Sequence, residues 1–139
     1  MSVVRQGIFA NNAFTASFTG LANTTYTGAL VTYDQRRRGA FETGSWSLFI
    51  HGTGVAVLTP QIQFCVDQGN ETYNPNIIGL SGYTNGTAAL VTTFTAANGF
   101  MCNLSAWIDQ WLYSDGFRIL IVKNSANAIT FTDGSIHAI

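Results

Sequence analysis

The chain has 139 residues, enough for one domain with a buried core, and its hydrophobic fraction of 47% argues against disorder. Only 9% of the residues are charged and the formal net charge is −1, so the chain lacks the basic field that a general nucleic-acid binder needs. No apolar run approaches the roughly 20 residues of a membrane-spanning helix, and no signal-peptide pattern opens the sequence. Synthesis in the cytoplasm is therefore expected.

The first forty residues hold short runs of aromatic and polar residues that Asn and Gly interrupt. We expect an N-terminal arm over residues 1–13 and a single β-sandwich domain over residues 14–139, because chain ends stay loose unless they dock onto a surface. Such an arm can add to a neighbouring subunit. The candidate interface residues at this end of the chain are Arg5, Phe9 and Phe14.

Three consecutive arginines, Arg36, Arg37 and Arg38, make up half of the 6 Lys and Arg residues. Asp34 and Glu42 flank them, which fits a solvated loop whose charge is partly neutralised. The alternative is a contact with an acidic protein surface, because the guanidinium fork pairs well with carboxylates. Both interpretations stay open, and the three arginines are further candidate interface residues.

Alternating apolar residues predict a strand that begins near Trp46 and places Leu48 and Ile50 on one face. Gly52–Gly54 is typical of a tight turn into a return strand. Pro60 interrupts that return strand, which indicates an edge position or a bulge, because proline cannot donate a hydrogen bond to a neighbouring strand.

Further strands are expected over residues 61–66, 88–94, 100–107 and 117–122. The last of these is almost continuously apolar, which predicts a central strand that is buried on both faces. Asn85–Gly86 and Asp133–Gly134 are two-residue hairpin signals, because both central positions of such a turn need positive φ. Residues 106–113 carry aromatic pairs at helical spacing, so a two-turn helix and an aromatic-rich strand end remain alternatives.

These segments add up to about eight to ten short strands separated by turns, a spacing typical of sandwiches and jelly rolls. The connections are too short for parallel crossovers, so antiparallel pairing is expected. The predicted fold is therefore an all-β, antiparallel, jelly-roll-like sandwich.

The sequence offers few groups for metal binding or nucleophilic catalysis. Neither His51 nor His137 belongs to a cluster of three or four ligand residues, so we expect no metal site and no cofactor. Cys65 and His51 have the residue types of a nucleophile and its base, yet Cys65 lies between apolar strand residues, as packed thiols do. We expect Cys65 and Cys102 to be buried thiols.

Two pairs of carboxylates, Asp67 with Glu71 and Asp109 with Asp115, have the residue types that glycoside hydrolysis uses. Each pair lies in a polar loop or turn segment, where Asp is favoured because it hydrogen-bonds to the local backbone. We therefore expect turn and solvation roles for these residues, and no enzyme activity.

Several segments together carry a family resemblance. They are a hairpin over Trp46–Val57, the run Gln61–Phe64 that leads into the Asp67 loop, Gly86–Leu90, and the ending Phe117–Asn124 with Ala128–Phe131. With these segments the chain resembles small structural proteins of tailed-bacteriophage virions over about two-thirds of its length. Residues 1–44 and 101–113 depart from the resemblance.

The resemblance implies a capsid decoration or cement protein that stabilises the phage head. Such a subunit is assembled into the virion in the host cytoplasm, forms homo-oligomers, and binds the major capsid protein or other virion proteins. From the composition we expect no nucleic-acid or membrane partner.

Two alternatives remain on the same fold. One is a carbohydrate-binding module, or a tail or head-fibre component, whose exposed aromatic residues would come from Trp107, Trp111, Tyr113 or Tyr83. The other is a small hydrolase that uses Asp67, Asp109 or His51, and it ranks well below the binding functions.

Overall fold

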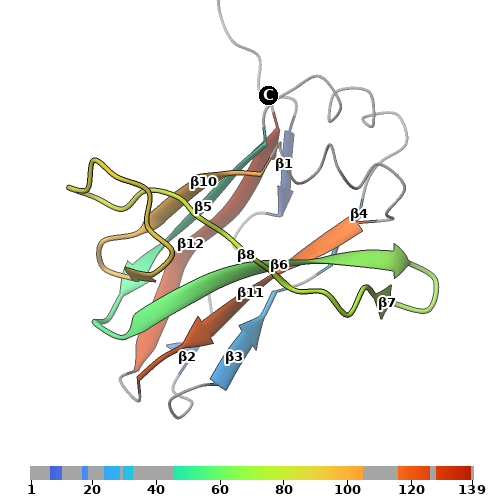
Figure 1. Ribbon diagram of the computed structural model, residues 1–139, viewed down its shortest axis with the longest axis horizontal. Helices are drawn as coiled ribbons and strands as arrows, with labels where there is room; N and C mark the ends of the chain where they lie inside the picture. Colours follow the sequence, from blue (N-terminus) through green and yellow to red (C-terminus); the bar gives the residue numbers. More distant parts are fainter. Residues whose placement is uncertain are drawn as a thin grey trace, which may run out of the picture.

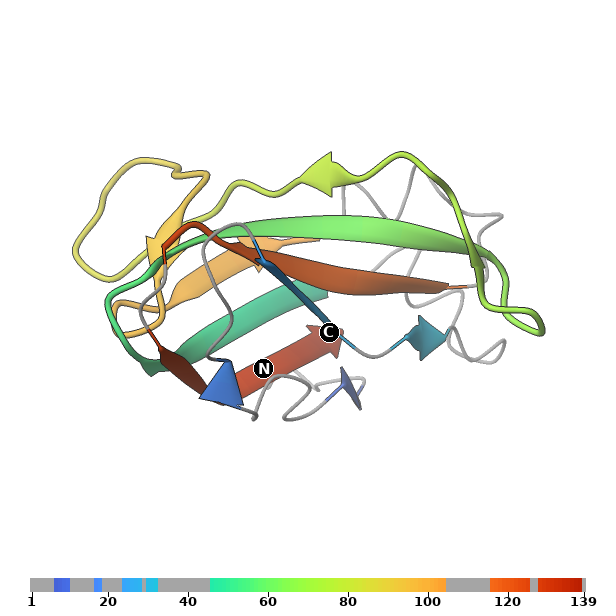
Figure 2. The same ribbon diagram turned by 90° about the horizontal axis from the view of Figure 1, so that it is seen from below.

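The computed structural model describes residues 7–10, 17–18, 24–28, 30–32, 46–104, 116–125 and 128–138. Within them the chain contains no helix, and its strands form two antiparallel sheets that pack face to face (Figures 1 and 2). The predicted all-β sandwich is confirmed. No helix in this described part of the chain is long and apolar enough to cross a bilayer.

Sheet A has the strand order β1-β12-β5-β10, with β2 also paired to β12. Its strands are β1 (Gly7–Ala10), β2 (Ser17–Phe18), β5 (Trp46–Thr53), β10 (Phe100–Asn103) and β12 (Ile129–Ala138). Residues 7–10 of the expected arm therefore form a strand that pairs with β12 of the same chain, while the boundaries of the arm stay a prediction.

Sheet B has the strand order β3-β11-β6-β7, with β4 paired to β11 and with β8 and β9 paired to β6. Its longer strands are β6 (Val57–Asp67) and β11 (Gly116–Lys123). The shorter ones are β3 (Thr24–Thr27), β4 (Val31–Thr32), β7 (Thr72–Tyr73), β8 (Ile78–Gly79) and β9 (Phe94–Thr95). The prediction of a buried central strand near residues 117–122 is confirmed, because β11 lies between β3 and β6 and six of its eight residues are buried.

The consecutive strands β5 and β6 belong to different sheets, so the hairpin expected over Trp46–Val57 is wrong. Gly54 has a φ of 119°, a conformation that favours glycine, and the chain passes there from sheet A to sheet B. The connection thus closes one end of the sandwich.

Pro60 lies in the middle of β6, in register with Ile121 of β11. The carbonyl of Pro60 accepts a hydrogen bond from the N–H of Leu80 at 3.0 Å, which places it on the edge of β6 that faces away from β11. In an antiparallel strand the nitrogen of a residue points to the same side as its carbonyl. The missing N–H of proline therefore faces the edge where β8 and β9 pair with β6 only in short stretches.

The hairpin signal at Asp133–Gly134 is wrong. Both residues lie inside β12, in register with His51 and Ile50 of β5, next to a register shift that marks a bulge. The bulge lies between Phe131 and Asp133, and Gly134 follows it in regular register with Ile50, so pairing with β5 overrides the local turn signal.

The signal at Asn85–Gly86 does form a turn, closed by a hydrogen bond of 3.3 Å from the N–H of Thr87 to the carbonyl of Thr84. Of its two central residues only Gly86 has positive φ, at 80°, so the expected conformation of Asn85 is wrong. Nor does a strand cover residues 88–94: only Phe94 belongs to β9, and Val91 makes an isolated bridge to Gly82.

One hydrophobic core fills the space between the sheets. Leu48 and Ile50 of sheet A and Ile62 and Phe64 of sheet B all belong to it and are almost fully buried. Two aromatic contacts join the layers: Tyr26 meets Phe131 edge-on at 5.4 Å between ring centres, and Phe94 stacks on Phe100 at 5.0 Å.

Candidate binding surface on sheet A

Strand alternation on β5 and β10 creates an outward-facing surface on sheet A. Leu48 and Ile50 point into the core, so Phe49 between them points outward. On β10, Phe100 and Cys102 point inward and Met101 outward. The register pairs Met101 directly with Phe49, so these two apolar side chains are neighbours on the outer face.

Tyr83 extends this row by one position. The N–H of Tyr83 donates to the carbonyl of Met101 at 2.8 Å, and the N–H of Met101 donates back at 2.9 Å. The bridge places Tyr83 beside β10 in the position of a further strand. Phe49, Met101 and Tyr83 therefore form one line across the strands, which we call the apolar row.

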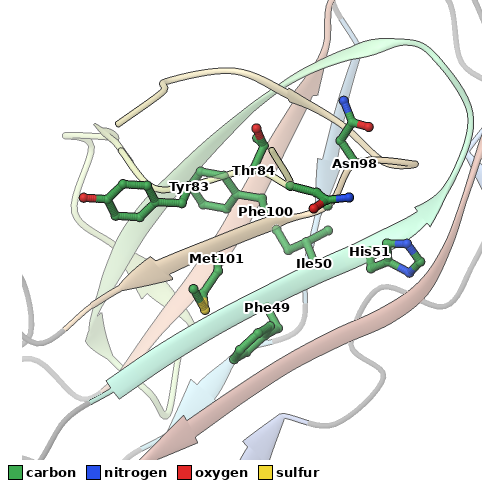
Figure 3. Close-up of a pocket in the computed structure, with 10 residues that line it drawn as sticks. Phe49, Ile50, His51, Tyr83, Thr84, Asn98, Phe100 and Met101 are labelled. Atoms are coloured by element: carbon green, nitrogen blue, oxygen red, sulfur yellow. The ribbon is translucent and has the colours of Figure 1, made fainter. Parts of the chain in front are cut away.

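The apolar row is exposed. Tyr83 and Met101 are each 44% exposed and Phe49 is 42% exposed, although all three are large apolar residues. Figure 3 shows Phe49 and Met101 side by side on their strands and the ring of Tyr83 reaching beyond β10. Because these three exposed side chains are contiguous, the apolar row is a candidate interaction surface.

Polar residues border the apolar row on both sides. On one side Ser47 pairs in register with Asn103, and Ser81 lies two residues before Tyr83. These three residues line a pocket of about 380 Å³ beside Leu90, which is 61% exposed.

A second pocket, of about 300 Å³, lies on the other side of the row (Figure 3). Its polar lining consists of His51, Thr84, Asn85 and Asn98. Gly99 lies in its floor with a φ of 77°, and the nearest atom to an added Cβ would be the Ile50 carbonyl oxygen at 3.2 Å.

For none of the interface residues expected from the sequence is the side chain described. Arg5, Phe14, Arg36, Arg37 and Arg38 lie outside the described residues, and of Phe9 only the backbone is described, in β1. Their role as an interface stays a prediction. The aromatic residues Trp107, Trp111 and Tyr113 also lie outside the described residues, as do Asp109 and Asp115.

The possible nucleophile–base pair of Cys65 and His51 does not form. Cys65 alternates with the core residue Phe64 and so faces the outside of sheet B, whereas His51 lies on the outside of sheet A. Cys102 instead points into the core. Both thiols are buried, as expected, and burial raises the pKa of Cys102 to about 12.

The carboxylate of Asp67 is hydrogen-bonded to residues of its own loop. It accepts hydrogen bonds from the N–H of Gly69 at 3.0 Å and from the side-chain amide of Asn70 at 2.8 Å. These bonds, led by that of the Asn70 side chain, lower the pKa of Asp67. The predicted turn role is confirmed, and no group of three or more potential metal ligands occurs in the part of the chain that the structure describes.

A polar cluster on the outer face of sheet B is structural. Nε and Nη2 of Arg118 on β11 donate to Oε1 of Gln63 on β6 at 3.0 and 2.8 Å, and Nε2 of Gln63 donates to the Asn74 carbonyl at 3.0 Å. The guanidinium also stacks on the ring of Tyr73, 3.6 Å from its centre. These contacts satisfy the buried Gln63 and tie β7 to the two long strands.

The comparisons with known proteins leave this surface as the main guide to function. No family model, curated protein or solved structure matches the chain. The resemblance to phage virion proteins therefore stays a prediction.

Sequence reasoning named Tyr83 as a possible exposed ring but did not find Phe49 and Met101. The signal was present, because the alternation that buries Leu48 and Ile50 sends Phe49 outward. That Met101 and Tyr83 lie beside Phe49 depends on strand pairing between distant parts of the chain, which no local pattern contains.

Proposed function

We propose that this protein is a non-enzymatic structural subunit of a tailed-phage virion, a capsid decoration or cement protein that binds the major capsid lattice and forms homo-oligomers. Attachment uses the N-terminal arm and the arginines Arg36, Arg37 and Arg38. The observation that carries the proposal is an antiparallel β-sandwich in a chain of which only 9% of the residues are charged, since such a composition suits packing against other subunits.

The chemistry of the described side chains supports a binding role. The Cys102 thiol is held protonated in the core, Cys65 is buried away from His51, and Asp67 is engaged by its own loop. A surface rich in hydroxyls and amides also costs less to desolvate than a charged one, which favours assembly into a larger particle.

Two measurements test the proposal. Mass spectrometry of gradient-purified particles should detect the protein, and the purified chain should co-sediment with capsids that lack it. Deleting residues 1–6, which leaves β1 in place, or replacing Arg36, Arg37 and Arg38 by alanine, should abolish co-sedimentation. The matched triple lysine variant keeps the charge but loses the fork geometry, so it should bind more weakly than the wild type and better than the alanine variant. A chain that is absent from particles and stays monomeric would refute the proposal.

A further inference from the structure

We infer that the outer face of sheet A binds a neutral oligosaccharide, which lies across the apolar row with its hydroxyl groups against the flanking polar residues. The inference rests on the surface itself. It does not depend on where the protein sits in a particle or on how it is attached there.

The apolar row has the shape for stacking against sugar rings. Phe49, Met101 and Tyr83 lie on three adjacent strand positions, so the row spans two interstrand spacings, or about 10 Å. A sugar ring presents C–H groups on its faces, and the face of an aromatic ring is complementary to them. The two rings at the ends of the row and the polarisable thioether between them offer a platform as long as a disaccharide.

The borders of the row supply hydrogen-bonding groups without charge. Side-chain amides and hydroxyls both donate and accept, as sugar hydroxyls do. They line the pockets on the two sides of the row and come from Ser47, Ser81, Asn103, Thr84, Asn85 and Asn98. None of the described residues that line the two pockets is an Asp, Glu, Lys or Arg. This composition favours a neutral ligand over a sulfated, phosphorylated or otherwise ionic one.

The dimensions favour an oligosaccharide over a second protein surface. A stable protein interface buries about 800 Å² on each partner around a continuous apolar centre. Among the described residues here, the exposed apolar side chains are those of the apolar row with Leu90 beside them, and the hollows next to the row measure about 300 and 380 Å³, the size of small-ligand sites.

The experiment begins with the full-length protein on an array of neutral gluco-, galacto-, manno- and xylo-oligosaccharides, with sialylated and sulfated glycans on the same array. Titration calorimetry with the best neutral compound then gives its affinity. We expect Tyr83→Ala and Phe49→Ala each to weaken binding at least tenfold. Tyr83→Phe and Phe49→Tyr keep a ring at each position and should stay within a few fold of the wild type.

Matched control variants distinguish a loss of binding at the apolar row from a loss of folding. Val55→Ala and Val66→Ala remove exposed apolar groups outside both pockets and should leave the affinity unchanged. Circular dichroism confirms that each variant is folded. The variant that lacks residues 1–6 keeps β1 and should still bind the oligosaccharide, and Tyr83→Ala should still co-sediment with capsids. A failure of the oligosaccharide inference is therefore distinct from a failure of the virion proposal.

Three outcomes would overturn the inference. The first is no binding to any neutral glycan at millimolar concentration. The second is binding to ionic glycans alone. The third is a self-association of the wild-type chain that Tyr83→Ala abolishes, which would assign the apolar row to a contact between copies of the chain.

Discussion

Glycines decide how closely segments approach one another in this fold. A Cβ on Gly82 would overlap the Met101 carbonyl oxygen and would lie 2.7 Å from the ring of Phe100. The absence of a side chain thus lets residues 82–83 pair with β10 and carry Tyr83 onto the apolar row. Gly79 has open space around its Cβ position, although it also lies in a paired segment.

Gly82→Ala should therefore destabilise the protein by about 1–3 kcal/mol, the typical cost of overpacking. The expected effect of Gly79→Ala is within about 1 kcal/mol of zero, because it adds only a methyl group in open space. Urea denaturation followed by circular dichroism measures both. Equal stabilities for the two variants would contradict the assigned contact.

The buried thiol of Cys102 makes the free energy of unfolding depend on pH in the alkaline range. Burial raises the pKa of Cys102 from 9.0 to about 12, so the native state keeps its proton after the unfolded state has lost it. The contribution is fully present below pH 9.0 and is lost as the pH rises towards about 12. The loss amounts to about 1.4 kcal/mol for each pH unit in that window.

The measurement compares the free energy of unfolding of the wild type and Cys102→Ala from neutral pH to above pH 9.0, under reducing conditions. Other titrating groups cancel in the difference between the two proteins. The alanine variant should be less stable at neutral pH, and its deficit should shrink as the pH rises. A deficit that stays constant with pH would show that Cys102 is accessible to solvent.

At the scale of elements, β5 contributes to both the core and the candidate binding surface, because its side chains point alternately to the two faces of sheet A. β5 lies between β12 and β10, where its inward residues build the core and its outward residues build the candidate binding surface. Stability and binding can therefore be altered separately in the same strand.

Ile50→Ala should cost about 2–5 kcal/mol, because it leaves a cavity in the packed core. Phe49→Ala, one residue away, should cost about 1 kcal/mol or less, because its ring is already partly exposed. Thermal and urea unfolding give both values. A larger loss at Phe49 than at Ile50 would reverse the assigned directions of the two side chains.

At the scale of the whole molecule, pairing between distant segments dominates. β1 near the start of the chain pairs with β12 at its end, β3 pairs with β11, and β5 pairs with both β10 and β12. Contacts of this kind require large loops to close before they stabilise the fold, so folding is slow.

Refolding should therefore occur in about milliseconds to seconds, as in other all-β domains. Stopped-flow tryptophan fluorescence after dilution from urea measures the rate. A chain that ends before Ile129 lacks the strand between β1 and β5 and the core residue Phe131, and it should show no cooperative unfolding. A sharp transition in that truncated chain would mean that β12 is not essential to the core.

The sequence by itself determined the class of the fold and the burial of its central elements. Period-two alternation around Leu48 and the continuous apolar run after Phe117 each reflect a local environment, which is why they predicted β5 and β11. The buried thiols and the turn role of Asp67 followed from the same local logic.

Only the tertiary structure decided which strands are neighbours. The Gly-rich segment after His51 and the dipeptide Asp133–Gly134 resemble hairpin turns, yet one passes between sheets and the other lies within β12. Glycine is compatible with all of these backbone conformations, so the local pattern cannot distinguish them. The apolar row arises in the same way. Phe49, Tyr83 and Met101 are far apart in sequence, and the register of sheet A brings them into one line.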